Sequence, residues 1–207
     1  AALAQMVGQS FPYTQIVALG SSKDAPLAQA IAERASHVRN LCGQTALGEA
    51  CALISRANAV VTNDSGLMHV AAALRRPLVA VYGSTDPRHT PPLSDLAKVQ
   101  WLNLECSPCF ERECPLGHLN CLKQLSAEQV FEDLRGMLLA QRHGRARGEL
   151  RGEPRRLPPR QWRNALPRRC RRHVCVLPRG HARGYRGFAG LTAAGPPPRR
   201  RGNCRTP

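Results

Sequence analysis

The stretch "AVVTNDSGLMHVAAALRRPLVAVYG" (residues 59–83) places an apolar run at each end of a polar break and a helix-like segment. The runs at 59–63 and 77–83 are rich in Val and Ala, which is typical of buried strands. Residues 65–76 have the length and composition of a helix. A strand, a helix and a second strand in such close succession indicate two parallel strands of one sheet.

The same alternation extends over residues 1–140. We predict helices at 1–9, 24–35, 45–57, 65–76 and 126–139, and strands at 15–20, 38–43, 59–63, 77–83 and 99–105. Strands that are apolar on both faces and alternate with helices predict a Rossmann-like α/β domain, with a parallel sheet covered on both sides. Ligands of such sheets bind beyond the carboxyl ends of the strands. The polar segments 20–24, 63–66 and 83–86 are therefore predicted to converge on one crevice.

Charge divides the chain near residue 140. Residues 1–140 carry 11 Lys and Arg against 12 Asp and Glu, whereas residues 141–207 carry 19 Arg against only Glu149 and Glu153. The second part is dominated by Arg, Pro and Gly, so we expect a disordered basic tail at 141–207. Two interpretations of this tail stay open: an arm that binds nucleic-acid phosphates, or the product of a GC-rich gene read out of frame.

No apolar run approaches the roughly 18 residues that a membrane-spanning helix needs, and no secretory signal peptide is recognised. The chain begins as if within a helix, so we expect that a further segment precedes it.

The junction at residues 63–69 has the chemistry of a nucleotide-sugar site. The first amides of a helix have no intrahelical partner and carry a partial positive charge, and the small Ser65 and Gly66 would let a diphosphate approach them. His69 lies on the same helical face as Ser65 and Gly66, whereas Asp64 would repel a phosphate and suits sugar hydroxyls. The alternative is a plain helix cap with a structural histidine.

The block "CGQTALGEACALISRANAVVTNDSGLMHVAAALRRPLVAVYGSTDP" followed by "LECSPCFERECPLGHLNCL" resembles the C-terminal half of the ADP-heptose:lipopolysaccharide heptosyltransferase II family, which has the two-domain GT-B fold. The resemblance spans about residues 1–139. It implies that residues 1–140 bind ADP-heptose, with a lipopolysaccharide inner-core heptose as acceptor. It also implies no cofactor, no specific nucleic acid, and a cytoplasmic location in contact with the inner membrane. Another GT-B sugar-nucleotide glycosyltransferase is the alternative.

Carried over by position, the resemblance implies that Asp64 contacts heptose hydroxyls and that the amides of Ser65 and Gly66, with His69, bind the diphosphate. Asp24 would accept hydrogen bonds from ribose hydroxyls, or serve only as a helix-start carboxylate. The family's basic phosphate-binding segment and its general base have no counterpart in this chain. We therefore predict donor binding without catalytic residues, and no turnover by this chain alone.

The segment "CSPCFERECPLGHLNC" brings five potential metal ligands within 16 residues: Cys106, Cys109, Cys114, His118 and Cys121. The first pair has zinc-knuckle spacing, but five candidates for four positions leave a zinc site ambiguous. Reduced, packed thiols or disulfides are the alternatives. Cys170, Cys175 and Cys204 fit no site.

Overall fold

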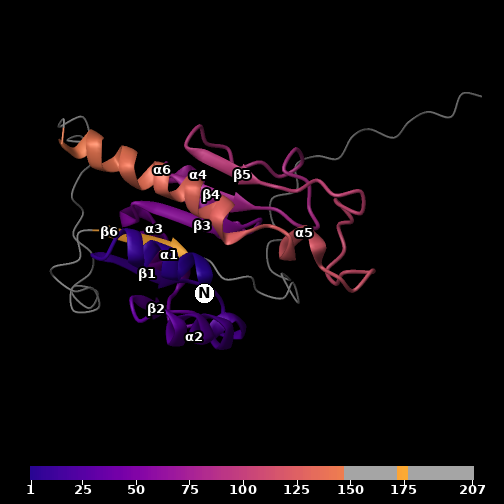
Figure 1. Ribbon diagram of the computed structural model, residues 1–207, viewed down its shortest axis with the longest axis horizontal. Coiled ribbons are helices and arrows are strands. Elements are labelled where there is room, and N and C mark those ends of the chain that lie inside the picture. The colour runs from indigo at the N-terminus through magenta and orange to yellow at the C-terminus, as the bar shows by residue number, and fades with distance from the viewer. Residues whose placement is uncertain (147–171, 177–207) are drawn as a thin grey trace, which may run out of the picture.

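The computed structural model describes residues 1–146 and 172–176, which form an α/β domain (Figure 1). The helices are α1 (Ala2–Ser10), the short 3-10 helix η1 (Ser22–Asp24), α2 (Ala25–Arg34), α3 (Leu47–Arg56), α4 (Gly66–Ala73), α5 (Asn120–Lys123) and α6 (Ala127–Ala146). The strands are β1 (Thr14–Ala18), β2 (Val38–Asn40), β3 (Ala59–Asn63), β4 (Leu78–Val81), β5 (Ala97–Gln100) and β6 (Arg172–Val176).

The described strands form one sheet in the order β2-β1-β6-β3-β4-β5. Each neighbouring pair runs parallel, so the carboxyl ends of all these strands lie at one edge. This confirms the predicted parallel α/β sheet. Doubly wound sheets usually follow the order 3-2-1-4-5-6, and β6 occupies the place of strand 1 in that order.

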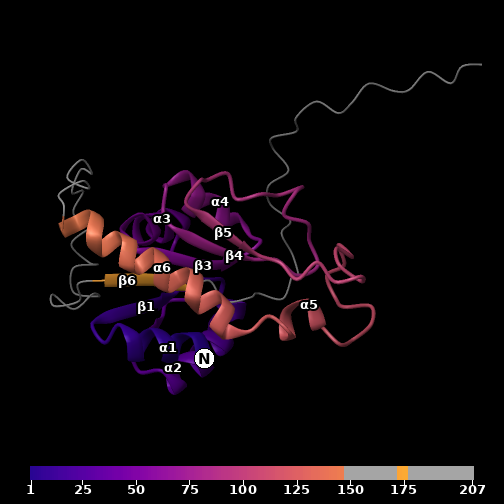
Figure 2. The same ribbon diagram turned by 45° about the horizontal axis from the view of Figure 1, so that its top comes forward.

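Helices cover both faces of the sheet (Figure 2). On one face, α1 and α6 pack over a core that includes Ile16, Val61 and Val79. On the other face, α3 and α4 pack over Val17, Val60 and Leu78. Side chains that are successive along a strand enter opposite cores, which explains the continuous apolar runs within β1, β3 and β4.

Side-chain hydrogen bonds fix the starts of two helices. At α6, the backbone N–H of Ser126 donates to the Gln129 side chain and that of Gln129 donates to the Ser126 hydroxyl, which together form a capping box. At α3, the backbone N–H of Ala46 donates to Glu49 at 2.8 Å, so the helix begins two residues later than predicted. β5 covers Ala97–Gln100, so it begins and ends earlier than the strand predicted at 99–105.

The prediction of a disordered tail from residue 141 onward is wrong at two places. Helix α6 continues to Ala146, and residues 172–176 form the strand β6 in the middle of the sheet. The average composition of the tail gives no sign of this strand, because a strand of only five residues forms here. It pairs with the backbone groups of β1 on one side and of β3 on the other. The remaining tail residues, and the nucleic-acid and frameshift interpretations that depend on them, lie outside the described residues.

A proline in β6 tests this pairing. At Val174 the strand has Ile16 of β1 on one side and Ala59 of β3 on the other. Val174→Pro removes a backbone donor from a central strand, and we expect a loss of at least about 2 kcal/mol in the free energy of unfolding. Val174→Ala keeps the donor and serves as the control. Urea denaturation of both variants measures the difference, and equal stability would show that β6 does not pair there.

Candidate functional site

The start of α4 presents its first turn at the carboxyl edge of the sheet. Ser65 is the N-cap, with an extended backbone (φ −159°, ψ 166°), and its side chain makes no capping bond to the helix. The Ser65 hydroxyl lies 3.4 Å from that of Thr62 instead. Gly66 is exposed, and so is His69 three residues later on the same face. The first amides of α4 therefore have no side-chain cap from Ser65, and an anion could bind them.

Asp64 lies between this helix start and the loop that follows β4. Its carboxylate accepts a hydrogen bond from the Thr90 hydroxyl at 3.1 Å. The Tyr82 hydroxyl donates to the backbone carbonyl of Thr90, and this second contact holds the same loop. Burial, and then the negative charge of Asp64, raise the pKa of Tyr82 to about 12 despite the bond to Thr90. Tyr82 therefore stays neutral, and one carboxylate oxygen of Asp64 is held toward Thr90.

Asp86 and Arg88 fix the turn of this loop. Asp86 is buried and accepts from the Arg88 side chain at 2.7–3.0 Å and from its backbone N–H at 2.8 Å. The hydrogen bond from Arg88 lowers the pKa of Asp86 to about 2. The exposed guanidinium also lies 5.6 Å from the ring centre of Trp101. This ion pair orders the loop, and it leaves a cation at the surface of the same edge.

Asp24 is placed differently from the other predicted residues. It is buried, and its Oδ2 accepts both the backbone N–H and the hydroxyl of Ser21, at 2.8 and 2.7 Å. Its visible role is thus to shape the turn at 21–24, the helix-start role that the sequence left open. Contact with ribose hydroxyls stays a prediction.

The three predicted loop segments do not lie equally close together. Strands β3 and β4 pair with Asn63 opposite Val81, and Asp64 contacts Thr90, so segments 63–66 and 83–86 adjoin. The strand β6 separates β1 from β3, which puts segment 20–24 two strands away from segment 63–66. Two of the three predicted segments, 63–66 and 83–86, are therefore neighbours, whereas segment 20–24 is separated from them by β6.

Sequence reasoning missed the contribution of Tyr82, Arg88 and Thr90. The aspartate, proline and arginine at 86–88 are a turn signal that could have drawn attention to Arg88. Nothing in the sequence indicates that Thr90 would return to Asp64, because this contact depends on how the loop folds.

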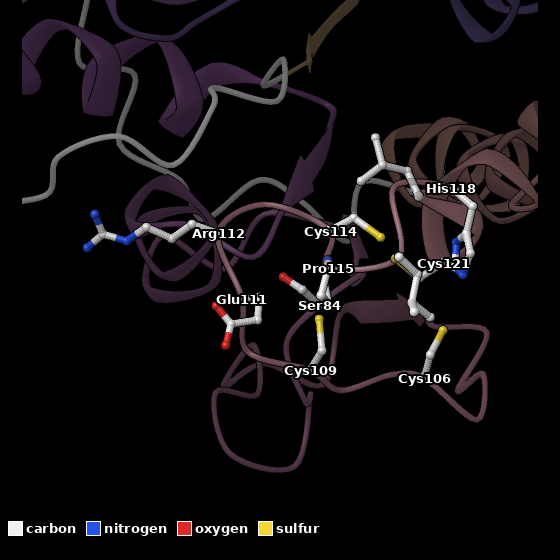
Figure 3. Close-up of a pocket in the computed structure, with 11 residues that line it drawn as sticks. Ser84, Cys106, Cys109, Glu111, Arg112, Cys114, Pro115, His118 and Cys121 are labelled. Atoms are coloured by element: carbon white, nitrogen blue, oxygen red, sulfur yellow. The ribbon is translucent and has the colours of Figure 1, made fainter.

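The cysteine-rich segment surrounds a pocket beyond the same sheet edge (Figure 3). The lining residues are Ser84, Cys106, Cys109, Glu111, Arg112, Cys114, Pro115, Leu116, His118, Leu119 and Cys121. Within the part of the chain that the structure describes, no group of three or more His, Cys, Asp or Glu side chains is arranged to hold a metal ion. Six cysteines are free thiols: Cys42, Cys51, Cys106, Cys109, Cys114 and Cys121.

The parallel sheet, with polar loops beyond its carboxyl edge, defines a Rossmann-like α/β domain of the kind found in GT-B glycosyltransferases. Residues 1–120 match the family model of glycosyltransferase family 9 (heptosyltransferase). The chain belongs to this family.

Two relatives show how far the similarity extends. Lipopolysaccharide heptosyltransferase 2 of Escherichia coli (strain K12) is 43% identical over 130 residues, which is 60% of this chain and 37% of that protein. Lipooligosaccharide heptosyltransferase 2 of Haemophilus influenzae is 51% identical over 129 residues, 59% of this chain and 37% of the relative. The chain thus spans less than two-fifths of the length of these relatives.

Solved structures agree with this assignment. The structure of E. coli ADP-heptose lps heptosyltransferase II superposes with a TM-score of 0.58 at 39% sequence identity, over 68% of this chain and 40% of that one. A family 9 glycosyl transferase from Veillonella parvula gives a TM-score of 0.56 at 28% identity, over 67% and 40% of the two chains. Within the described residues, no helix is long and apolar enough to cross a membrane.

Replacing Asp86 by Asn tests the loop. Because the folded pKa of Asp86 is lowered from 3.8 to about 2, its ion pair stabilises the fold above pH 3.8 and is lost as the pH falls toward 2. We expect Asp86→Asn to lower the melting temperature by a few degrees at neutral pH and to remove this part of the acid dependence. Thermal denaturation between pH 2 and 7 measures both effects.

The control is Asp95→Asn, which removes a carboxylate that is 72% exposed and 3.5 Å from Arg75. Such a surface pair contributes little to the stability of the fold. The melting temperature of Asp95→Asn should therefore match that of the unchanged chain at each pH. An acid dependence that is the same in all three proteins would contradict the role given to Asp86.

Proposed function

We propose that this chain is the donor-binding half of a heptosyltransferase that transfers heptose from ADP-heptose to the lipopolysaccharide inner core. The observation that carries the proposal is the uncapped start of α4, with Gly66 and His69 exposed on one face and the carboxylate of Asp64 beside them. Membership of glycosyltransferase family 9 and similarity to lipopolysaccharide and lipooligosaccharide heptosyltransferases support the choice of donor and acceptor.

In this proposal the diphosphate of the donor binds at the α4 N-terminus. The amides of Ser65 and Gly66 donate to its oxygens, and His69 adds a further donor from the same helical face. Asp64 accepts from hydroxyls of the heptose, since its charge disfavours a position against phosphate. Arg88 is an exposed cation on the adjoining loop, although its charge is partly balanced by the ion pair with Asp86.

The reaction itself is an inverting transfer. A hydroxyl of the acceptor attacks the anomeric carbon of the heptose, the bond from that carbon to the diphosphate oxygen breaks, and ADP leaves. Charge accumulates on the diphosphate as this bond breaks, so fixed amides at the helix start stabilise the transition state more than the bound donor. The helix dipole alone contributes about 0.3–2 kcal/mol. We assign the general base to the complete enzyme and not to the residues of this chain.

Gly66 and His69 are exposed, so a second domain that supplies the acceptor has access to this helix start. Acceptor binding and turnover are therefore assigned to the complete enzyme, in the cytoplasm at the surface of the inner membrane. The chain alone is expected to bind ADP and to show no transfer.

Calorimetric titration with ADP tests the diphosphate site. We expect the 207-residue chain to bind ADP. His69→Ala should raise the dissociation constant for ADP about tenfold, which corresponds to the loss of one hydrogen bond to a charged group. The control is Arg75→Gln, which changes an exposed residue just beyond the opposite end of α4. No binding of ADP or ADP-heptose, even with the N-terminal half of a relative added, would refute the proposal.

The role of Asp64 is tested by comparing the binding affinity for ADP with that for ADP-heptose. Asp64→Asn should leave ADP affinity little changed and abolish most of the additional affinity that heptose confers. Thr90→Val removes the hydroxyl that contacts Asp64 but keeps the carboxylate, so the heptose-dependent gain should persist. If Thr90→Val abolished the gain as completely as Asp64→Asn, the carboxylate would act on the loop and not on the sugar. UDP- and GDP-sugars in the same titration report donor specificity.

A further inference from the structure

The cysteine-rich segment 101–125 contains a cluster of thiols that the proposed transfer reaction does not use. Cys106 and Cys109 lie on one side of the pocket and Cys114 lies on the other, with the Cys109 thiol directed into the space between them (Figure 3). All three side chains are partly exposed, so small molecules in solution can reach them. A pocket with several accessible thiols invites the question of which of them is a nucleophile.

The loop that follows Cys114 is folded around its sulfur. Gly117 and Leu119, on either side of His118, both have left-handed backbones, with φ of 68° and 56°, which bend the chain into a tight loop after Cys114. Hydrogen bonds from the N–H groups of Leu119, Leu116, Gly117 and His118 lower the pKa of Cys114, although partial desolvation opposes them. These donors favour the thiolate, which is the reactive form of cysteine.

Other cysteines of the chain provide a contrast. Cys42 is buried, and burial together with the nearby charge of Asp24 raises its pKa to about 11. Cys51 lies on α3 and is partly exposed, but it is not among the residues that line the pocket. The combination of exposure, surrounding N–H groups and neighbouring thiols distinguishes Cys114 from both.

The remaining polar groups of the pocket fit a thiol site better than a zinc site. The Nδ1 atom of His118 accepts a hydrogen bond from the backbone N–H of Asn120 at 3.0 Å, which places the ring proton on Nε2. Neither nitrogen is then available as a metal ligand without breaking this bond or losing the proton. The charged residues that line the pocket are Glu111 and Arg112, of opposite sign.

We propose that this pocket is an oxidation site, in which Cys114 reacts with a peroxide and then forms a disulfide with Cys106 or Cys109. The Cys114 thiolate attacks one peroxide oxygen, the O–O bond breaks, and a sulfenic acid forms as hydroxide leaves and takes up a proton. The second thiol attacks the sulfenic sulfur, the S–O bond breaks and water leaves. Overall, two thiols are oxidised to one disulfide while hydrogen peroxide is reduced to two waters.

The disulfide would form next to the proposed donor site. The Ser107 hydroxyl donates to the carbonyl of Gly83, and the Phe110 N–H donates to that of Ser84 at 2.7 Å. Ser107 lies between Cys106 and Cys109, so closing a bond to either one would pull on the end of β4. The oxidation itself does not depend on the assignment of the donor.

Alkylation followed by peptide mass spectrometry tests the first part of the proposal. The reduced 207-residue chain, in buffer with a chelator, is treated with limiting iodoacetamide at neutral pH. Cys114 should be labelled at least about tenfold faster than Cys42 and faster than Cys51. The pH at which its labelling rate reaches half its maximum should lie below that of the same cysteine in the urea-unfolded chain. Equal rates for Cys114 and Cys51, or no difference on unfolding, would overturn the proposal.

Hydrogen peroxide tests the second part. Stoichiometric peroxide should convert Cys114 and either Cys106 or Cys109 into a disulfide-linked peptide pair, and Cys114→Ser should abolish this product. Cys51→Ser is the matched control and should leave it unchanged. A disulfide between Cys106 and Cys109 that persists in Cys114→Ser would overturn the assignment of the nucleophile. Bound zinc that protects all the pocket thiols until the chelator is added would identify a metal site instead.

Discussion

The continuity of the sheet across the position between β1 and β3 is the constraint on which the domain depends. Strands β2 and β1 form one group, and β3, β4 and β5 form another, and the structure shows no direct pairing between them. A strand must lie between them, since otherwise the buried backbone groups of two central edges would lose their hydrogen bonds. Here β6 fills this position, drawn from a part of the chain whose composition argues against order. Its place is that of the first strand in a doubly wound sheet.

The two cores explain why most of the fold can be predicted from local patterns. Val60 and Val61 are neighbours in sequence but enter opposite cores, and Val17 and Ile16 behave in the same way. Such runs require helices on both faces, so the α/β class follows from the sequence. The strand β6 does not follow, because a five-residue segment in an Arg-rich context becomes a strand only when two partners are already in place. The start of α3 is displaced by two residues for a local reason, because the backbone N–H of Ala46 donates to the Glu49 side chain.

The candidate site separates into a local part and a part that depends on tertiary structure. Ser65, Gly66 and His69 belong to one helix start, and their spacing alone places them on one face. Asp64 was recognised as a sugar-binding candidate, but its contact with Thr90 spans 26 residues and had no signal in the sequence. Asp24 shows the opposite case. Its position after a strand suggested a ligand, whereas its burial and its two bonds from Ser21 show a carboxylate occupied by its own turn.

The end of β4 joins the two chemistries that we assign to this sheet edge. Tyr82 points its hydroxyl toward Thr90, which in turn contacts Asp64, while the carbonyls of Gly83 and Ser84 accept from the cysteine-rich segment. Gly83 is needed here, because a β-carbon would come within 2.9 Å of Leu122. A side chain at this position would force the Leu122 side chain of the cysteine-rich segment to shift. The proposed donor site and the thiol pocket therefore share one short backbone segment, and a covalent change in the pocket would act on the loop that contacts Asp64 through it.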